Sequence, residues 1–150
     1  MDVLKITSNP LFPWKKLQEF EANFLKSEKG VGASACFVGT MRDFNEGDDV
    51  IAMTLEHYPA MTQRQLQCIV AKSYQQWPLL HTMLIHRVGK ILPSEPIVVV
   101  AAWSAHREAA FEACRFLMEE LKTSAPFWKK EQLLNGDERW VTHNTKATSN

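Results

Sequence analysis

The order in which helix and strand patterns follow one another restricts the fold of this chain more than any other feature. Amphipathic helices are predicted at 14–28, at about 62–77 and at about 105–122. Strand-like segments lie between them, at 31–41, 50–58, 81–89 and 96–103. The strands therefore occur in adjacent pairs and do not alternate singly with helices. This order favours an α+β fold, in which helices cover an antiparallel or mixed sheet, over a doubly wound parallel sheet.

The ends of these elements are predicted from capping and turn residues. Thr62 and Gln65 have the spacing of a capping box, and Ser104 is suited to cap the third helix. Asn135-Gly136 predicts a tight turn between two short strands late in the chain, and a further strand is expected at the N-terminus. The inward faces of the first and third helices are predicted to hold Trp14, Leu17, Phe20, Phe24 and Leu25, and Ala110, Cys114, Leu117 and Leu121.

The length and charge of the chain limit the classes of protein it can belong to. Its 150 residues suit one domain over 1–150, with a frayed tail at about 143–150. The 17 basic and 17 acidic side chains give a formal net charge of zero, which argues against a general nucleic-acid binder. A local basic pocket remains compatible with this balance.

The location of the protein is predicted from its apolar runs and its cysteines. The first ten residues lack the long apolar core of a secretory signal, and the apolar run at 97–103 is too short to cross a bilayer. The three cysteines form no CxxC pair, which favours a reducing compartment. We expect a cytoplasmic protein. The five histidines show no recognised metal spacing, so no metal site is predicted.

The stretch LKTSAPFWKKE, at 121–131, places lysines on both sides of a proline and two large aromatic residues. Lys122 lies near a predicted helix end, where a cation complements the helix dipole. Phe127 and Trp128 could be core anchors with solvated lysines around them. Alternatively, they form a stiff apolar wall that partly desolvates a lysine, which lowers its pKa and suits it to proton transfer or nucleophilic work.

Two further stretches contain candidate anion-binding residues. His106 and Arg107 fall at the start of the third predicted helix, where free backbone N–H groups attract anions and cations are otherwise unfavourable. They form either an anion site or a pair of solvated side chains. Arg42 lies in a polar loop between Gly39 and Gly47, as a clamp for an anionic ligand or as an exposed loop arginine.

Several motifs occur together in an order that resembles one family. They are GTMRDFN, TLEHYPAMT, IHRVGKILP, SAHREAAFEA and LKTSAPFWKKE, spread over about 30–141. Together they resemble the large, catalytic subunit of molybdopterin synthase, the MoaE family. The resemblance implies an α/β hammerhead-like α+β fold with an additional small antiparallel sheet. Relatives can also carry a basic residue soon after the final Trp-Val pair, whereas Thr142, His143 and Asn144 stand there in this chain.

The resemblance also implies an activity and a set of partners. The family is a sulfurtransferase of molybdenum cofactor biosynthesis, and it converts cyclic pyranopterin monophosphate into the dithiolene of molybdopterin. Sulfur arrives as a thiocarboxylate at the C-terminal Gly-Gly tail of a small ubiquitin-like, MoaD-type partner. A homodimer of large subunits with one partner at each end makes a heterotetramer. No cofactor is implied, because the pterin is the substrate and the partner brings the sulfur.

The roles of individual residues follow from the same resemblance. Lys122 and Lys129 correspond to catalytic lysines, and Phe37 and Met118 to residues that line the pocket. The residues that correspond to substrate-binding positions are Thr40, Met41, Arg42, His106, Arg107, Lys130 and Glu131. Rival interpretations remain: a non-catalytic anion- or nucleotide-binding module that uses the same basic pocket, a Schiff-base lysine enzyme, and a nucleic-acid module.

Overall fold

The computed structural model describes residues 2–141, which form two β-sheets and three α-helices. The first sheet has four strands in the order β1 (Asp2–Thr7), β5 (Leu79–Arg87), β7 (Pro96–Ser104) and β2 (Ala33–Thr40). β1 runs parallel to β5, and the other two pairs are antiparallel. The sheet is therefore mixed, and the expected N-terminal strand is present.

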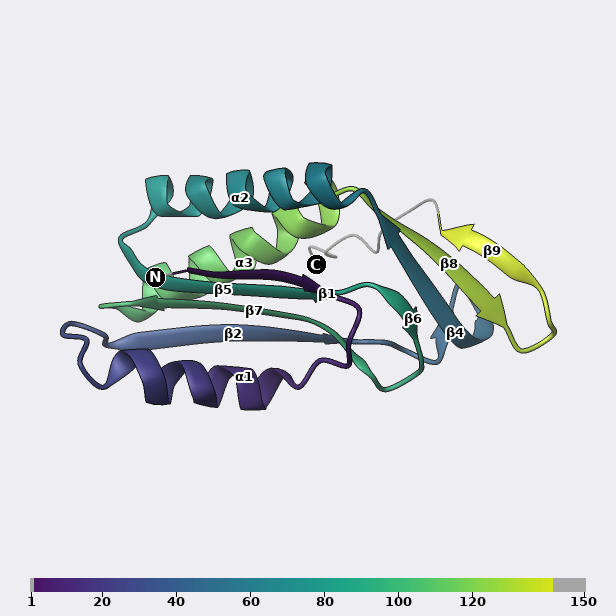
Figure 1. Cartoon of the computed structure of the whole chain (residues 1–150), viewed down its shortest axis with the longest axis horizontal. Coiled ribbons are helices and arrows are strands. Elements are labelled where there is room, and N and C mark those ends of the chain that lie inside the picture. The colour runs from purple at the N-terminus through teal and green to yellow at the C-terminus, as the bar shows by residue number, and fades with distance from the viewer. Residues whose placement is uncertain (1, 142–150) are drawn as a thin grey trace.

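Helices cover both faces of this sheet, as Figure 1 shows. α2 (Pro59–Gln76) and α3 (Arg107–Ser124) lie on one face, and α1 (Pro13–Phe20) lies on the other. α1 continues into a single π-helical turn, η1 (Glu21–Leu25). The result is three layers with a hydrophobic core on each side of the sheet.

The sequence of β7 explains how one sheet supports two cores. Successive side chains of a strand point to opposite faces. Val98, Val100 and Ala102 accordingly pack in the core beneath α2 and α3. Val99, Ala101 and Trp103 pack in the core beneath α1. The continuous apolar run is needed because neither face meets water, so the prediction of a fully buried strand is confirmed.

A second, antiparallel sheet extends from one end of the molecule (Figure 1). Its central strand, β4 (Asp48–His57), pairs with β8 (Phe127–Leu133) and with the short β6 (Gly89–Ile91). β3 (Phe44–Asn45) pairs with the start of β4, and β9 (Glu138–Val141) pairs with β8. The predicted α+β class with an additional small antiparallel sheet is confirmed.

The turn between β8 and β9 lies where Asn135-Gly136 predicts it. Gly136 has a φ of +93°, a conformation that glycine adopts without steric cost. Its backbone N–H donates to the carbonyl of Leu133 at 3.0 Å. The predicted tail at 143–150, together with Thr142, lies outside the described residues.

Both predicted helix caps are wrong. α2 begins at Pro59, three residues before Thr62, because proline at the first helical position has no N–H to satisfy. Thr62 is instead buried inside the helix. Ser104 belongs to β7, and its hydroxyl donates to the carbonyl of Pro78 at 2.9 Å. His106 occupies the capping position of α3 with extended backbone, and its side chain makes no capping hydrogen bond.

The first helix also differs from its prediction. The α-helix ends at Phe20, not near residue 28, and the π-helical turn follows it. Trp14 is 65% exposed, although an inward position was expected. It precedes Phe20 by six residues, which places the two side chains about 120° apart around an α-helix. Because Phe20 faces the core, Trp14 faces away from it. The predicted inward residues of α3 are all buried.

Tyr74 fastens the N-terminal strand to α2, which leads to a testable prediction. Its hydroxyl donates to Asp2 Oδ1 at 2.5 Å, and Thr82 donates to the same oxygen at 2.8 Å. Burial and this hydrogen bond raise the pKa of Tyr74, so its hydroxyl stays a donor at neutral pH. Tyr74→Phe is expected to lower the unfolding free energy by about 1 kcal/mol in urea titrations. Tyr58→Phe, at the chain's other tyrosine, which is exposed, is expected to leave it unchanged. Equal effects of the two substitutions would contradict this role of Tyr74.

Candidate active site

A cavity of about 230 Å³ lies where the two sheets meet the end of α3. β2 and α3 contribute much of its wall, and β8 closes it from the second sheet. Its polar side chains are those of Thr40, His86, Lys122 and Lys129. The rest of the cavity wall is apolar and consists of Phe37, Val38, Gly39, Leu55, Ile97, Val98, Met118, Leu121, Ala125 and Phe127.

A second, smaller cavity of about 130 Å³ shares part of this wall. Thr40, Ile97, Lys122 and Lys129 line both cavities. The second cavity adds Met41, Arg42 and Glu131 from the residues that the sequence predicts, together with Phe44, Asn45, Met53 and Val141. The two lysines thus lie where the cavities adjoin, with Arg42 in the wall of the smaller one.

The local sequence explains why Lys122 and Lys129 come together. Lys122 lies in the last turn of α3, and the helix ends at Ser124. Pro126 disfavours helical backbone at the residue before it, and Ala125 is extended, with φ −79° and ψ 133°. The chain then enters β8, where alternate side chains face the same side. Phe127 and Lys129 therefore both line the cavity, in front of the helix end that carries Lys122.

The surroundings of Lys129 lower the pKa of its ammonium group. Burial is the main cause, and the positive charges of Lys122 and Arg42 add to it, so the pKa of Lys129 is lowered. The Glu131 carboxylate acts in the opposite direction. Lys129 consequently exchanges a proton at a lower pH than an exposed lysine does. This is the property that an apolar wall beside a lysine predicts, but only Phe127 of the two aromatic residues lines the cavity, and Trp128 is exposed.

Glu131 lies beside the second cavity, but its carboxylate already has partners. Only 6% of the residue is exposed. Asn45 Nδ2 donates to both oxygens, at 3.2 and 3.1 Å, and Arg139 Nε donates at 2.9 Å. Arg139 also donates to Asp48 Oδ2 and to the Asn45 carbonyl, each at 2.8 Å. Glu131 therefore ties β8 and β9 to the β3–β4 hairpin that follows Arg42.

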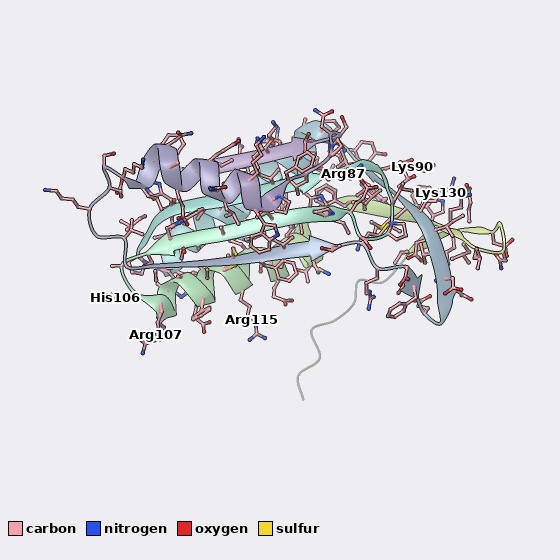
Figure 2. The ribbon with its side chains drawn as sticks, turned by 90° about the horizontal axis from the view of Figure 1, so that it is seen from below. Arg87, Lys90, His106, Arg107, Arg115 and Lys130 are labelled. Carbon is pink, nitrogen blue, oxygen red and sulfur yellow. The ribbon has the colours of Figure 1, made fainter. Side chains whose placement is uncertain are left out.

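Three of the predicted site residues lie outside both cavities. Lys130, next to Lys129 on β8, forms an ion pair with Glu138 at 2.8 Å, with its ammonium 5.8 Å from the centre of the Trp140 ring. His106 and Arg107 are exposed at the N-terminal end of α3. Arg107 precedes Lys122 by 15 residues, or about 22 Å along a helix. Figure 2 shows His106 and Arg107 at the opposite end of the molecule from Lys130.

His86 is a cavity residue that the sequence analysis did not select. It lies on β5, and its ring stacks on Phe127 with 4.1 Å between centroids and 14° between planes. Strand alternation could have found it, because His86 shares a face with Leu84, which lies in the core under α2 and α3. A histidine on a buried face of a strand needs hydrogen-bond partners for its ring nitrogens. It lies in the motif IHRVGKILP, for which the family resemblance gives this histidine no role.

Neither a cluster of metal ligands nor a membrane-spanning helix is found in residues 2–141. This part of the chain contains no group of three His, Cys, Asp or Glu side chains placed to hold a metal ion. None of its helices is long and apolar enough to cross a membrane.

The fold and the cavity define an α+β protein with a paired-lysine pocket between two sheets. The family model described as MoaE protein matches residues 12–124. The molybdopterin synthase catalytic subunit of Pseudomonas aeruginosa is 53% identical over 122 residues, which cover 81% of each chain. The chain belongs to the MoaE protein family.

Two solved structures share the fold. The molybdopterin biosynthesis MoaE protein from Burkholderia ambifaria is 43% identical, with a TM-score of 0.76, over 94% of this chain and 89% of that one. A complex of subunits 1 and 2 of molybdopterin-converting factor from Helicobacter pylori contains a chain that is 20% identical, with a TM-score of 0.76. That match covers 94% of this chain and 91% of the other. At that identity the likeness concerns the fold alone.

Proposed function

We propose that this chain is the catalytic subunit of a molybdopterin synthase and acts as a sulfurtransferase. Its substrate is cyclic pyranopterin monophosphate, and its product carries the dithiolene of molybdopterin. The observation that carries this proposal is the convergence of Lys122 and Lys129 on one cavity, with Lys129 desolvated beside a second cation. Membership of the MoaE family and relatives named as catalytic subunits support the same activity.

The cavity suits a reaction between two anions. The pterin carries a phosphate, and the sulfur arrives as a thiocarboxylate on the C-terminal Gly-Gly tail of a small ubiquitin-like partner. Lys122, Lys129 and Arg42 hold both anions close together, which supplies proximity. When the thiocarboxylate sulfur attacks the pterin side chain, the leaving oxygen needs a proton. A lysine with a lowered pKa delivers it, and the neighbouring cations stabilise the charge that develops. Water then cleaves the thioester bond between the sulfur and the partner, so the sulfur stays on the pterin and the partner leaves with a C-terminal carboxylate.

The assembly proposed with this function is a homodimer with one sulfur-carrier partner at each end, located in the cytoplasm. The protein needs no cofactor of its own, because the partner supplies the sulfur.

His106 and Arg107 are proposed to bind an anionic group of the substrate. Since they lie at the far end of α3 from Lys122, they would have to reach a cavity of the second copy.

This sharing of sites between two copies can be tested by mixing inactive variants. Lys122→Ala and Arg107→Ala chains are each expected to lose most activity alone. Mixing equal amounts and allowing subunits to exchange should restore roughly a quarter of wild-type activity, because half of the dimers are mixed and each then has one intact site. No recovery after complete exchange would show that Arg107 does not complete the site of the other copy.

The function itself is tested by reconstitution. Purified protein, a thiocarboxylated ubiquitin-like partner and cyclic pyranopterin monophosphate are combined, and the dithiolene product is measured. Product formation that depends on all three components is the expected result. A folded protein that binds the pterin but forms no product would favour the non-catalytic anion-binding module instead.

A further inference from the structure

His86 is a titratable side chain in the cavity wall that the proposed sulfur transfer does not use. Its Nδ1 lies 2.7 Å from the backbone carbonyl of Arg87. One face of the ring stacks on Phe127. These two contacts hold the imidazole in one orientation, and only 8% of the residue is exposed.

The hydrogen bond determines which nitrogen carries the proton. A carbonyl oxygen only accepts, so Nδ1 must donate its N–H to Arg87. Burial lowers the pKa of His86 to about 4; the hydrogen bond to Arg87 opposes this shift, and the charges of Lys129, His57 and Lys122 add to it. The ring is consequently neutral at pH 7, and Nε2 carries a lone pair without a proton.

This lone pair contrasts with the other polar groups of the cavity. Lys122 and Lys129 carry only donors when protonated, and Thr40 has a hydroxyl that serves either way. Within residues 2–141, the bond of Nδ1 is the only hydrogen bond that the His86 side chain makes. The cations suit the phosphate and the thiocarboxylate, whereas an acceptor in the same wall suits a neutral group with an N–H or O–H.

We propose that His86 is a substrate-binding residue whose Nε2 accepts a hydrogen bond from an N–H or O–H group of the pterin ring system. This proposal rests on the proposed function and deepens it. The cations hold the charged ends of the reactants, and His86 recognises the heterocycle between them. Phe37, Met118 and Phe127 supply apolar surface against which a flat ring can pack.

Two substitutions separate the roles of the two ring nitrogens. In His86→Asn the side-chain amide can still donate to the Arg87 carbonyl, but the acceptor at the Nε2 position is lost. In His86→Gln the longer side chain places its carbonyl oxygen near the position of Nε2. We expect His86→Asn to raise the Kd for cyclic pyranopterin monophosphate by about tenfold to a hundredfold, and His86→Gln to stay within about threefold of wild type.

Inorganic phosphate provides the matched control, because it tests the cationic part of the cavity alone. Its Kd, from titrations followed by NMR, should be the same in wild type and both variants. Pterin binding by His86→Asn equal to wild type would overturn the proposal. So would a parallel loss of phosphate binding, since that would indicate a collapsed cavity. If wild type itself does not bind the pterin, the proposed function is wrong. If wild type binds the pterin and His86→Asn binds it equally well, only the proposed role of His86 is wrong.

A measurement on the unmodified protein avoids any folding defect of the variants. Long-range ¹H–¹⁵N spectra of wild type at pH 7 should show His86 protonated at Nδ1 and unprotonated at Nε2. Addition of the pterin should shift the Nε2 resonance, while addition of phosphate should not. An Nε2 that carries the proton in the free protein would overturn the proposal.

Discussion

Lys122→Ala and Lys129→Ala are each expected to reduce dithiolene formation by about a hundredfold to ten-thousandfold, the usual contribution of a positioned proton donor. Both ammonium groups line the two adjoining cavities. Alanine at either position removes a cation that is proposed to hold an anionic reactant, and at Lys129 it also removes the group with the lowered pKa. Product is measured in single-turnover reactions with the thiocarboxylated partner, so that chemistry is separated from partner exchange.

Lys130 supplies the informative comparison, because it is the next residue of β8 and lies on the other side of the strand, outside both cavities. The family resemblance assigns it to the substrate, whereas its observed partners are Glu138 and the Trp140 ring. From this geometry we expect Lys130→Ala to retain activity within about threefold of wild type, as the surface ion pair that it loses contributes little. Losses of equal size at Lys129 and Lys130 would contradict the assignment of roles by cavity position.

The second large expected effect is the loss of folding stability in acid that the buried His86 causes. The pKa of His86 is about 4 in the folded protein and about 6.5 when unfolded. Below pH 6.5 the unfolded chain therefore binds a proton that the folded protein does not, and stability falls as the pH drops towards 4. The difference of about 2.5 pKa units corresponds to a loss of about 3 kcal/mol from this residue. Above pH 6.5 the contribution no longer changes.

His86→Phe isolates this effect, because phenylalanine preserves the flat ring against Phe127 and cannot be protonated. At pH 7 the variant is expected to be less stable by about 1 kcal/mol, since the Arg87 carbonyl loses its donor. Between pH 7 and pH 4, wild type should lose about 3 kcal/mol more unfolding free energy than the variant does. Urea titrations at several pH values measure both curves. Parallel curves would mean that His86 is not held neutral by the fold.

Local patterns in the sequence were sufficient for the helices and the longer strands, but not for all of their ends or for the shortest strands. The stripe of Ala110, Cys114, Leu117 and Leu121 is buried as predicted, because helical spacing brings these residues to one face. The caps at Thr62 and Ser104 were wrong for different reasons. A proline occupies the first helical position of α2, whereas Ser104 extends β7 and donates its hydroxyl to the carbonyl of Pro78, 26 residues away in the sequence. The short strands β3 and β6 were missed, since two or three residues carry no periodicity.

The predicted site residues were likewise correct only in part. Motif resemblance selected Phe37, Thr40, Met118, Lys122 and Lys129, which the structure brings together around one cavity. It also selected Lys130, His106 and Arg107, which lie elsewhere in the same chain. A motif records which residue types stand together in a family, but it does not state on which side of a strand a lysine lies or at which end of a helix a cavity opens.

The sequence by itself determined the α+β class, the inward face of α3, the fully buried β7 and the family, because each depends on spacing within a short segment or on a quoted motif. Only the tertiary structure decided that Lys129 is desolvated beside Lys122 and that Glu131 is held by Arg139 and Asn45. It alone placed a neutral His86 in the cavity wall. These properties depend on burial and on charges brought close by segments far apart in the chain, and no local pattern contains that information.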